Sequence, residues 1–273
     1  MEATQPRLDE PKSVNRKRWW VHLVLITSYL LVVALLSMMR NKPNHPALSH
    51  TATGLLIVCG AELLLFGIIF AAAWAASRAS RDDLRLRWRG KGMPVLLGLG
   101  YSVSLRIAVG VLIGFVGMVL ILSHVMTPDS MRDFFDKNRP GVENLVDVSA
   151  MRNNAAYFWL SLTVVSFVVA GLREELWRAS FLAGLEALWP RQFCSTPGKV
   201  CAVGIAAIIF GLGHVSMGVI ASFMAGALGF GLGLIMVFHR SIWPAVLAHG
   251  FFDATSMALI PWALEVMHHL PKP

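Results

Sequence analysis

Long apolar stretches constrain the fold of this chain more than any other feature of its sequence. A helix of about 20 mostly apolar residues crosses the hydrocarbon core of a bilayer, and seven stretches of roughly that length follow one another here. Hydrophobic residues make up 56% of the 273 residues and charged residues 15%, whereas soluble domains contain about 45–50% and about 25%. We therefore predict an all-α fold, a polytopic transmembrane helical bundle of about seven spans (6–8). The expected spans are Trp19–Met39, Thr53–Ala76, Pro94–Val125, Ala155–Leu188, Lys199–Val215, Gly218–Phe238 and Ser241–Ile260.

The basic residues gather beside the expected spans, and this sets the expected orientation. The net charge of +8 comes largely from residues 7–18 and 78–91. Loops rich in Lys and Arg stay in the cytoplasm, where they meet anionic lipid headgroups. We therefore predict a multi-pass protein of the plasma or inner membrane, with the N-terminus and Arg78–Met93 cytoplasmic and Thr127–Asn154 outside. Membrane lipid accounts for the charge, and no nucleic-acid partner is expected.

The sequence divides into five segments by polarity. A basic cytoplasmic tail is followed by three N-terminal spans, an outer polar loop, a transmembrane core that holds most of the unusual residues, and a C-terminal tail. These segments are 1–18, 19–125, 126–154, 155–260 and 261–273. In the first three spans the charges at membrane depth are Glu62 and Arg106, and we expect them to form an ion pair with each other. Small residues recur at every fourth position of the sixth span, a pattern that favours close helix packing; they are Ala221, Ala225, Gly229 and Gly233.

The segment "AGLREELWRASF" interrupts an apolar stretch of the core with four charged residues. Ionisable side chains at membrane depth are costly and mark functional sites by default. Further along the chain, His214 lies in "FGLGH", and His249 and Asp253 lie in "LAHGFFD". Residues four apart on a helix share a face. We therefore expect Glu174 to face Arg178, and His249 to face Asp253.

The depths of these side chains are compatible with one buried polar site. With alternating topology and a rise of about 1.5 Å per residue, Glu174 lies roughly 21 Å from the cytoplasmic end of its span, His214 roughly 22 Å and His249 roughly 12 Å. Carboxylates beside imidazoles can activate water and stabilise an oxyanion. The structural alternative is a lone transmembrane His that bonds between helices, beside a Glu–Arg pair that neutralises itself. Glu175 points about 100° away from Glu174 and needs a second partner. This favours a catalytic site over the structural alternative.

Three short patterns in this core resemble those of a known family. The acidic pair followed by Arg178, then "FGLGH", then "WPAVLAHGFFD" is similar to the CPBP family, which comprises CAAX proteases and bacteriocin-processing or immunity proteins of the Abi type. The family patterns are EExxxR, FxxxH and HxxxN/D on successive transmembrane helices. Phe210–His214 matches the second pattern and His249–Asp253 matches the third. The resemblance covers about residues 155–260.

The first pattern departs from the family by one residue, because this chain reads EExxR. If Arg178 is the anchor, Arg173 stands at the first Glu position and Glu174 at the second. If the acidic pair is the anchor, Glu174 stands first and Glu175 second. The resemblance implies that the first Glu activates water. We favour the acidic pair as the anchor, because the other choice places a cation where a base belongs.

The resemblance implies an intramembrane endopeptidase, a hydrolase that acts on a membrane-associated peptide or protein. The implied roles are Glu174 as the base, His214 as a second contact to the water, Glu175 and Arg178 as orienting residues, and His249 with Asp253 as the oxyanion partners. The alternative from another class is a catalytically silent membrane binding or bacteriocin-immunity protein that keeps the polar cavity. An ion or solute transporter is less favoured, because no inverted repeat or pair of broken helices is evident.

The metal requirement is a separate question. A zinc site normally has three or four His, Cys or carboxylate ligands, and only two candidates here are imidazoles, His214 and His249. Arg178 also places a cation within one helical turn of the site, and that charge repels a divalent ion. We therefore predict a metal-independent mechanism, with zinc as the alternative.

Overall fold

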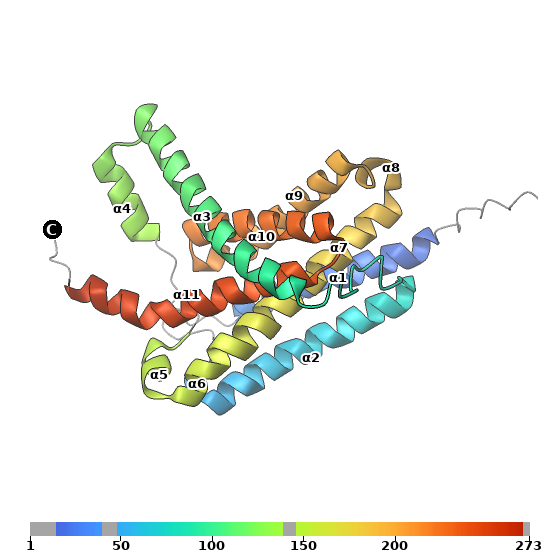
Figure 1. Ribbon diagram of the computed structural model, residues 1–273, viewed down its shortest axis with the longest axis horizontal. Helices are drawn as coiled ribbons and strands as arrows, with labels where there is room; N and C mark the ends of the chain where they lie inside the picture. Colours follow the sequence, from blue (N-terminus) through green and yellow to red (C-terminus); the bar gives the residue numbers. More distant parts are fainter. Residues whose placement is uncertain (1–14, 40–47, 139–145, 270–273) are drawn as a thin grey trace, which may run out of the picture.

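The computed structural model describes residues 15–39, 48–138 and 146–269, and every regular element within them is a helix. This confirms the predicted all-α class (Figure 1). The elements are α1 (Arg16–Met39), α2 (Ala52–Ser77), α3 (Met93–Leu122), α4 (Pro128–Asn138), α5 (Val148–Asn153), α6 (Ala155–Leu160), the π-helix η2 (Ser161–Arg173), α7 (Glu174–Leu188), α8 (Pro190–Phe193), α9 (Thr196–Leu212), the 3-10 turn η3 (Val215–Met217), α10 (Val219–His239) and α11 (Trp243–His269).

Several of these helices are long and apolar enough to cross a membrane. Among the described residues, four meet both criteria: α2, α3, the continuous helix Ala155–Leu188 and α10. The apolar helix α9 is shorter, and α1 and α11 occupy the first and last of the expected spans. The chain is therefore a multi-pass helical membrane protein, and the total of about seven spans stays a prediction.

Polar residues at the ends of the apolar stretches explain where several helices begin and end. The Thr51 and Ser195 side chains cap α2 and α9, each accepting a hydrogen bond from a backbone N–H in the first turn. Such caps satisfy donors that a helix start leaves free. Arg78 and Arg240 end α2 and α10 in the left-handed conformation. Each of these apolar stretches therefore forms a helix that is bounded by a polar capping residue.

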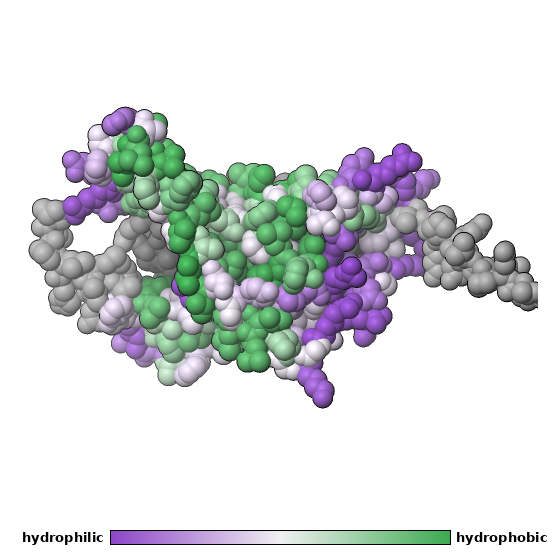
Figure 2. Space-filling view, turned by 45° about the horizontal axis from the view of Figure 1, so that its top comes forward, coloured by the Kyte–Doolittle hydropathy of each residue, from purple (hydrophilic) through white to green (hydrophobic). Residues whose placement is uncertain are grey.

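The described parts of the two basic segments predicted to be cytoplasmic, residues 15–18 and 78–91, lie at one end of the bundle. In Figure 1 the start of α1 and the ends of α2 and α7 lie together at the right. Arg85 joins this end to α7 through an ion pair with Glu186 at 2.6 Å, and Ser241 joins it to α11 through a hydrogen bond to the Arg87 carbonyl oxygen. Figure 2 shows apolar side chains over the middle of the visible face and hydrophilic ones towards both ends, with a large group of them at this same end on the right.

Reporter fusions can test which side of the membrane this end faces. Because the basic residues stay in the cytoplasm, we expect a cytoplasmic signal from a fusion at Gly90 and an outside signal from a fusion at Asn138. Gly90 comes shortly before α3, and Asn138 is the last residue of α4, which follows α3 in the chain. An outside signal at Gly90 would reverse the assigned orientation.

The segment expected to be an outer polar loop contains two short helices, α4 and α5. Asp147 caps α5 by accepting a hydrogen bond from the Ala150 N–H at 2.9 Å, and the His50 ring lies 2.5 Å from its second oxygen. The Ala150 N–H and the His50 side chain hold the pKa of Asp147 below its usual value. This carboxylate therefore fastens the outer segment to the start of α2.

The first two spans pack against the core through buried polar contacts. The Trp177 ring of α7 donates a hydrogen bond to the Ile26 carbonyl oxygen of α1 at 3.2 Å. His22 of α1 is fully buried, and its two ring nitrogens lie 3.0 and 3.1 Å from the carbonyl oxygens of Ala73 on α2 and Ser180 on α7. The helices α1, α2 and α7 are thus held together by hydrogen bonds as well as by apolar packing.

Candidate active site

The helix that carries the charged segment changes its winding next to that segment. Residues Ser161–Arg173 form a π-helix, and Glu174 begins the α-helix α7. The Ser166 hydroxyl follows the wider winding, because it donates to the Ser161 carbonyl oxygen five residues earlier at 2.9 Å. π segments are rare and often occur at functional sites. The two consecutive glutamates therefore begin a helix of ordinary pitch directly after a wider one.

Two glycines bring α11 close to this junction. A Cβ atom at Gly171 would lie 2.8 Å from the Val246 carbonyl oxygen, and one at Gly250 would lie 2.2 Å from the Phe167 ring. A larger residue at either position would push the helices apart. This close approach places His249 of α11 beside the glutamates.

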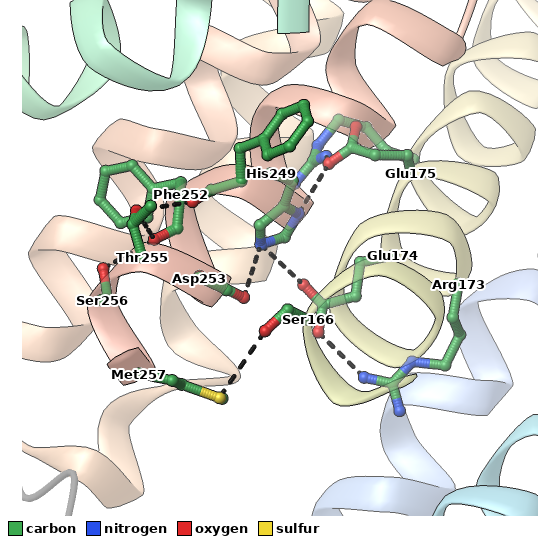
Figure 3. Close-up of polar contacts among 12 residues, drawn as sticks. Ser166, Arg173, Glu174, Glu175, His249, Phe252, Asp253, Thr255, Ser256 and Met257 are labelled. Atoms are coloured by element: carbon green, nitrogen blue, oxygen red, sulfur yellow. Dashed lines mark hydrogen bonds and ion pairs between the residues drawn. The ribbon is translucent and has the colours of Figure 1, made fainter. Parts of the chain in front are cut away.

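His249 lies between three carboxyl groups (Figure 3). Its Nδ1 is 3.2 Å from Glu175 Oε1, and its Nε2 is 3.8 Å from Glu174 Oε2 and 3.6 Å from Asp253 Oδ2. The expected pairing of His249 with Asp253 is therefore confirmed. The two Nε2 distances exceed the usual hydrogen-bond range of about 2.7–3.2 Å, so this N–H is close to two carboxylates without being bonded to either.

Arg178 pairs with Glu175, and this corrects the predicted pairing of Arg178 with Glu174. Both side chains are fully buried, and the partners are three residues apart on α7. The guanidinium also lies over the Phe210 ring of α9, 4.9 Å from its centroid. On a helix, positions three and four residues away are both neighbours, so spacing alone could not choose between the two glutamates.

Glu174 has a different cation, Arg173, which the sequence prediction had not paired with it. Arg173 Nη2 lies 2.9 Å from Glu174 Oε1, and Arg173 Nη1 lies 3.0 Å from Glu62 Oε1 on α2. The expected ion pair between Glu62 and Arg106 is therefore wrong. Arg106 instead bonds to α11, donating to the Phe252 carbonyl oxygen at 2.7 Å. The position of each charge along its span predicted that it lies at membrane depth, but it did not predict which helices are neighbours.

His214 is the one predicted site residue whose contacts with the others are indirect. It lies two residues beyond the end of α9, directly before η3, and its Nδ1 lies 2.8 Å from the Phe210 carbonyl oxygen. The Phe210 ring lies 4.6 Å from the His214 ring and 6.4 Å from the His249 ring, measured between centroids. Phe210 is therefore the residue that both imidazoles approach.

The small-residue stripe of α10 makes room for Arg178 as well as for α9. A Cβ atom at Gly229 would lie 2.9 Å from the Phe210 ring and 3.2 Å from Arg178 Nη2. At Gly233 it would lie 2.6 Å from the Val203 side chain. The predicted packing stripe thus also shapes the space in which a buried guanidinium lies.

The donor set does not fit a zinc ion in this arrangement. Among the described parts of the chain, no three His, Cys, Asp or Glu side chains form a group that could hold a metal. Glu175 is engaged by Arg178 and Glu174 by Arg173, whereas zinc needs three or four free ligands. We derive no catalytic step through a metal.

The comparison with protein families agrees with this geometry. Residues 155–255 match a family model described as type II CAAX prenyl endopeptidase Rce1-like. No curated protein and no solved structure matches the chain. The matched range contains all six predicted site residues, and it confirms the resemblance inferred from the three patterns. Residues 155–255 are therefore a domain of the Rce1-like type II CAAX prenyl endopeptidase family.

Proposed function

We propose that this protein is an intramembrane endopeptidase of the CAAX type, which cleaves a peptide bond with an activated water molecule. One observation carries the proposal: the imidazole of His249 lies among the carboxyl groups of Glu174, Glu175 and Asp253 inside an apolar bundle. Charged groups at membrane depth are costly and are kept where they act. Carboxylates and an imidazole together supply a base and a hydrogen-bond donor for peptide hydrolysis.

Exposure distinguishes the two glutamates and supports Glu174 as the base. The Glu174 side chain keeps 17% of its surface exposed, whereas Glu175 has none and is bonded to Arg178. Glu174 therefore has accessible surface for a water molecule, and Glu175 has none. The gap of 3.8 Å between Glu174 Oε2 and His249 Nε2 suits a bridging water better than a direct hydrogen bond.

The proposed reaction uses these groups in order. Glu174 takes a proton from the water, and the resulting hydroxide attacks the carbonyl carbon of the scissile peptide. The oxyanion that forms accepts a hydrogen bond from His249, which Asp253 and Glu175 orient. When the C–N bond breaks, Glu174 returns its proton to the leaving amine. His214 keeps the part that the sequence prediction gives it, a second contact to the water, whereas its own contacts in the structure are with Phe210.

The family name points to a substrate class. The matched family model is described as a CAAX prenyl endopeptidase, and a site within a membrane suits a prenylated peptide. The proposed substrate is therefore a membrane-associated peptide or protein, with a prenylated C-terminal segment as the first candidate.

A second candidate function is a catalytically silent membrane binding or immunity protein. The contact between Arg173 and Glu174 favours it, because a neighbouring cation weakens a carboxylate as a base. The two functions differ in whether purified protein turns over a peptide.

A peptide library decides between these two functions. Purified protein is incubated with quenched fluorescent peptides, prenylated and unprenylated, and the products are identified by mass spectrometry. We expect cleavage by the wild-type chain and none by Glu174→Ala. Binding without cleavage by both proteins would favour the silent alternative.

Metal analysis of the active protein tests the predicted metal-independent mechanism. We expect less than stoichiometric zinc in purified active protein and unchanged cleavage after treatment with a chelator, because the carboxylates are already engaged by arginines. Stoichiometric zinc that is lost together with activity in His214→Ala would contradict this expectation.

A further inference from the structure

Arg173 is shared between two carboxylates that belong to different helices. Its two terminal nitrogens lie 3.0 Å from Glu62 on α2 and 2.9 Å from Glu174 on α7. Its side chain is only 12% exposed, and its guanidinium lies 5.9 Å from the centre of the Tyr29 ring of α1. Glu62 lies outside the family domain, so this contact joins the N-terminal spans to the proposed base.

The charge balance of this trio bears on how Glu174 can act. A guanidinium paired with a single carboxylate holds that carboxylate as an ion pair and makes it a poor proton acceptor. A second carboxylate beside the other terminal nitrogen of the guanidinium offsets part of that positive charge. Glu62 stands in that second position.

We propose that Glu62 is a positioning residue, which divides Arg173 between two carboxylates and so leaves Glu174 free to accept a proton. The inference rests on the proposed function, in which Glu174 is the base. It also gives a role to the Arg that stands directly before the acidic pair.

The other groups that face Glu174 come from the elements packed around it. His249 of α11 lies 3.8 Å from Glu174, with Asp253 beside His249 on the same helix, and Tyr29 of α1 lies beside Arg173. Of these elements and α2, only α2 supplies a carboxylate on the far side of Arg173 within the described residues. The proposal therefore isolates a single side chain for substitution.

The test compares Glu62→Gln with the wild-type chain and with a second-site variant. Glu62→Gln is expected to lower kcat about tenfold and to leave KM within about twofold, because a general base loses efficiency as its basicity falls. Adding Arg173→Gln removes the unbalanced cation, and the double variant is expected to recover most of the lost activity. A merely structural role for Glu62 would lower the unfolding midpoint of Glu62→Gln together with kcat, whereas the proposed role lowers kcat at an unchanged midpoint.

Matched controls separate folding from the proposed effect. Glu186→Gln breaks an ion pair of the same kind with Arg85, at roughly 18 Å along α7 from Glu174, and it should leave kcat unchanged. Glu62 is 34% exposed, so an amide there can be accommodated; the unfolding midpoint in detergent checks this.

Each outcome decides one of the two claims. Wild-type activity in Glu62→Gln, or a double variant no better than Glu62→Gln, would overturn the role of Glu62 while leaving the endopeptidase proposal standing. A wild-type chain that cleaves nothing would overturn the proposed function and this inference with it. A fully active Glu174→Gln variant would overturn Glu174 as the base, and this inference with it, while leaving the endopeptidase proposal standing.

Discussion

Glu174→Gln is expected to lower the rate of peptide cleavage about 10²–10⁴-fold, the usual contribution of a general base. The amide keeps the size of the side chain and can still accept a hydrogen bond from Arg173, but it cannot take a proton from water. The protein should therefore remain inserted and folded. Cleavage of a quenched fluorescent peptide measures the rate, and the unfolding midpoint in detergent measures the fold.

Two further variants test the register of the first pattern. If the acidic pair is the anchor, Glu174→Gln should cost far more activity than Arg173→Ala. Full activity in Glu174→Gln, together with loss of activity in Arg173→Ala or Glu175→Gln, would show that the register assigned here is wrong.

Arg178→Met is expected to destabilise the protein by about 3–5 kcal/mol, because it leaves the fully buried Glu175 carboxylate without its cation. The change also leaves space beside Phe210 and Gly229, which the guanidinium contacts. The unfolding midpoint in detergent is the measurement, with activity recorded in parallel.

Removing both charges provides the control for this prediction. Replacing a buried ion pair by neutral groups is often close to neutral, so Glu175→Gln combined with Arg178→Met should recover most of the lost stability. The exposed pair of Arg87 and Asp82 offers a second comparison, because Arg87→Ala should cost less than about 1 kcal/mol. A stable Arg178→Met single variant would contradict the assigned role.

The sequence predicted the parts of the site that depend on one helix at a time. The helical spacing of His249 and Asp253 was enough to place them on one face, and the three patterns identified the family domain. Pairs of residues on different helices were harder to predict from the sequence. Arg178 had two glutamates within reach, and the choice followed from Arg173 and His249, which engage Glu174 and Glu175.

The wrong pairing of Glu62 with Arg106 has a similar cause. Their depths matched, but α2 packs against η2 while α3 packs against α11. Close contacts at glycines such as Gly98 and Gly171 decide those neighbours, and no charge pattern encodes them. The π-winding of Ser161–Arg173 also left no sign in the apolar sequence.

The hydrogen bonds from α1 to α7 have a consequence for how the domain boundary is understood. A boundary at residue 155 separates Ser180 from His22, and Trp177 from the Ile26 carbonyl oxygen. In a fragment that begins at residue 155, the Trp177 indole N–H would lose its acceptor and face lipid. Water is absent there and cannot replace that acceptor. The matched domain is thus smaller than the unit that these hydrogen bonds hold together. During synthesis α1 and α2 emerge first, and they supply the surface against which α7, with its two glutamates, later docks.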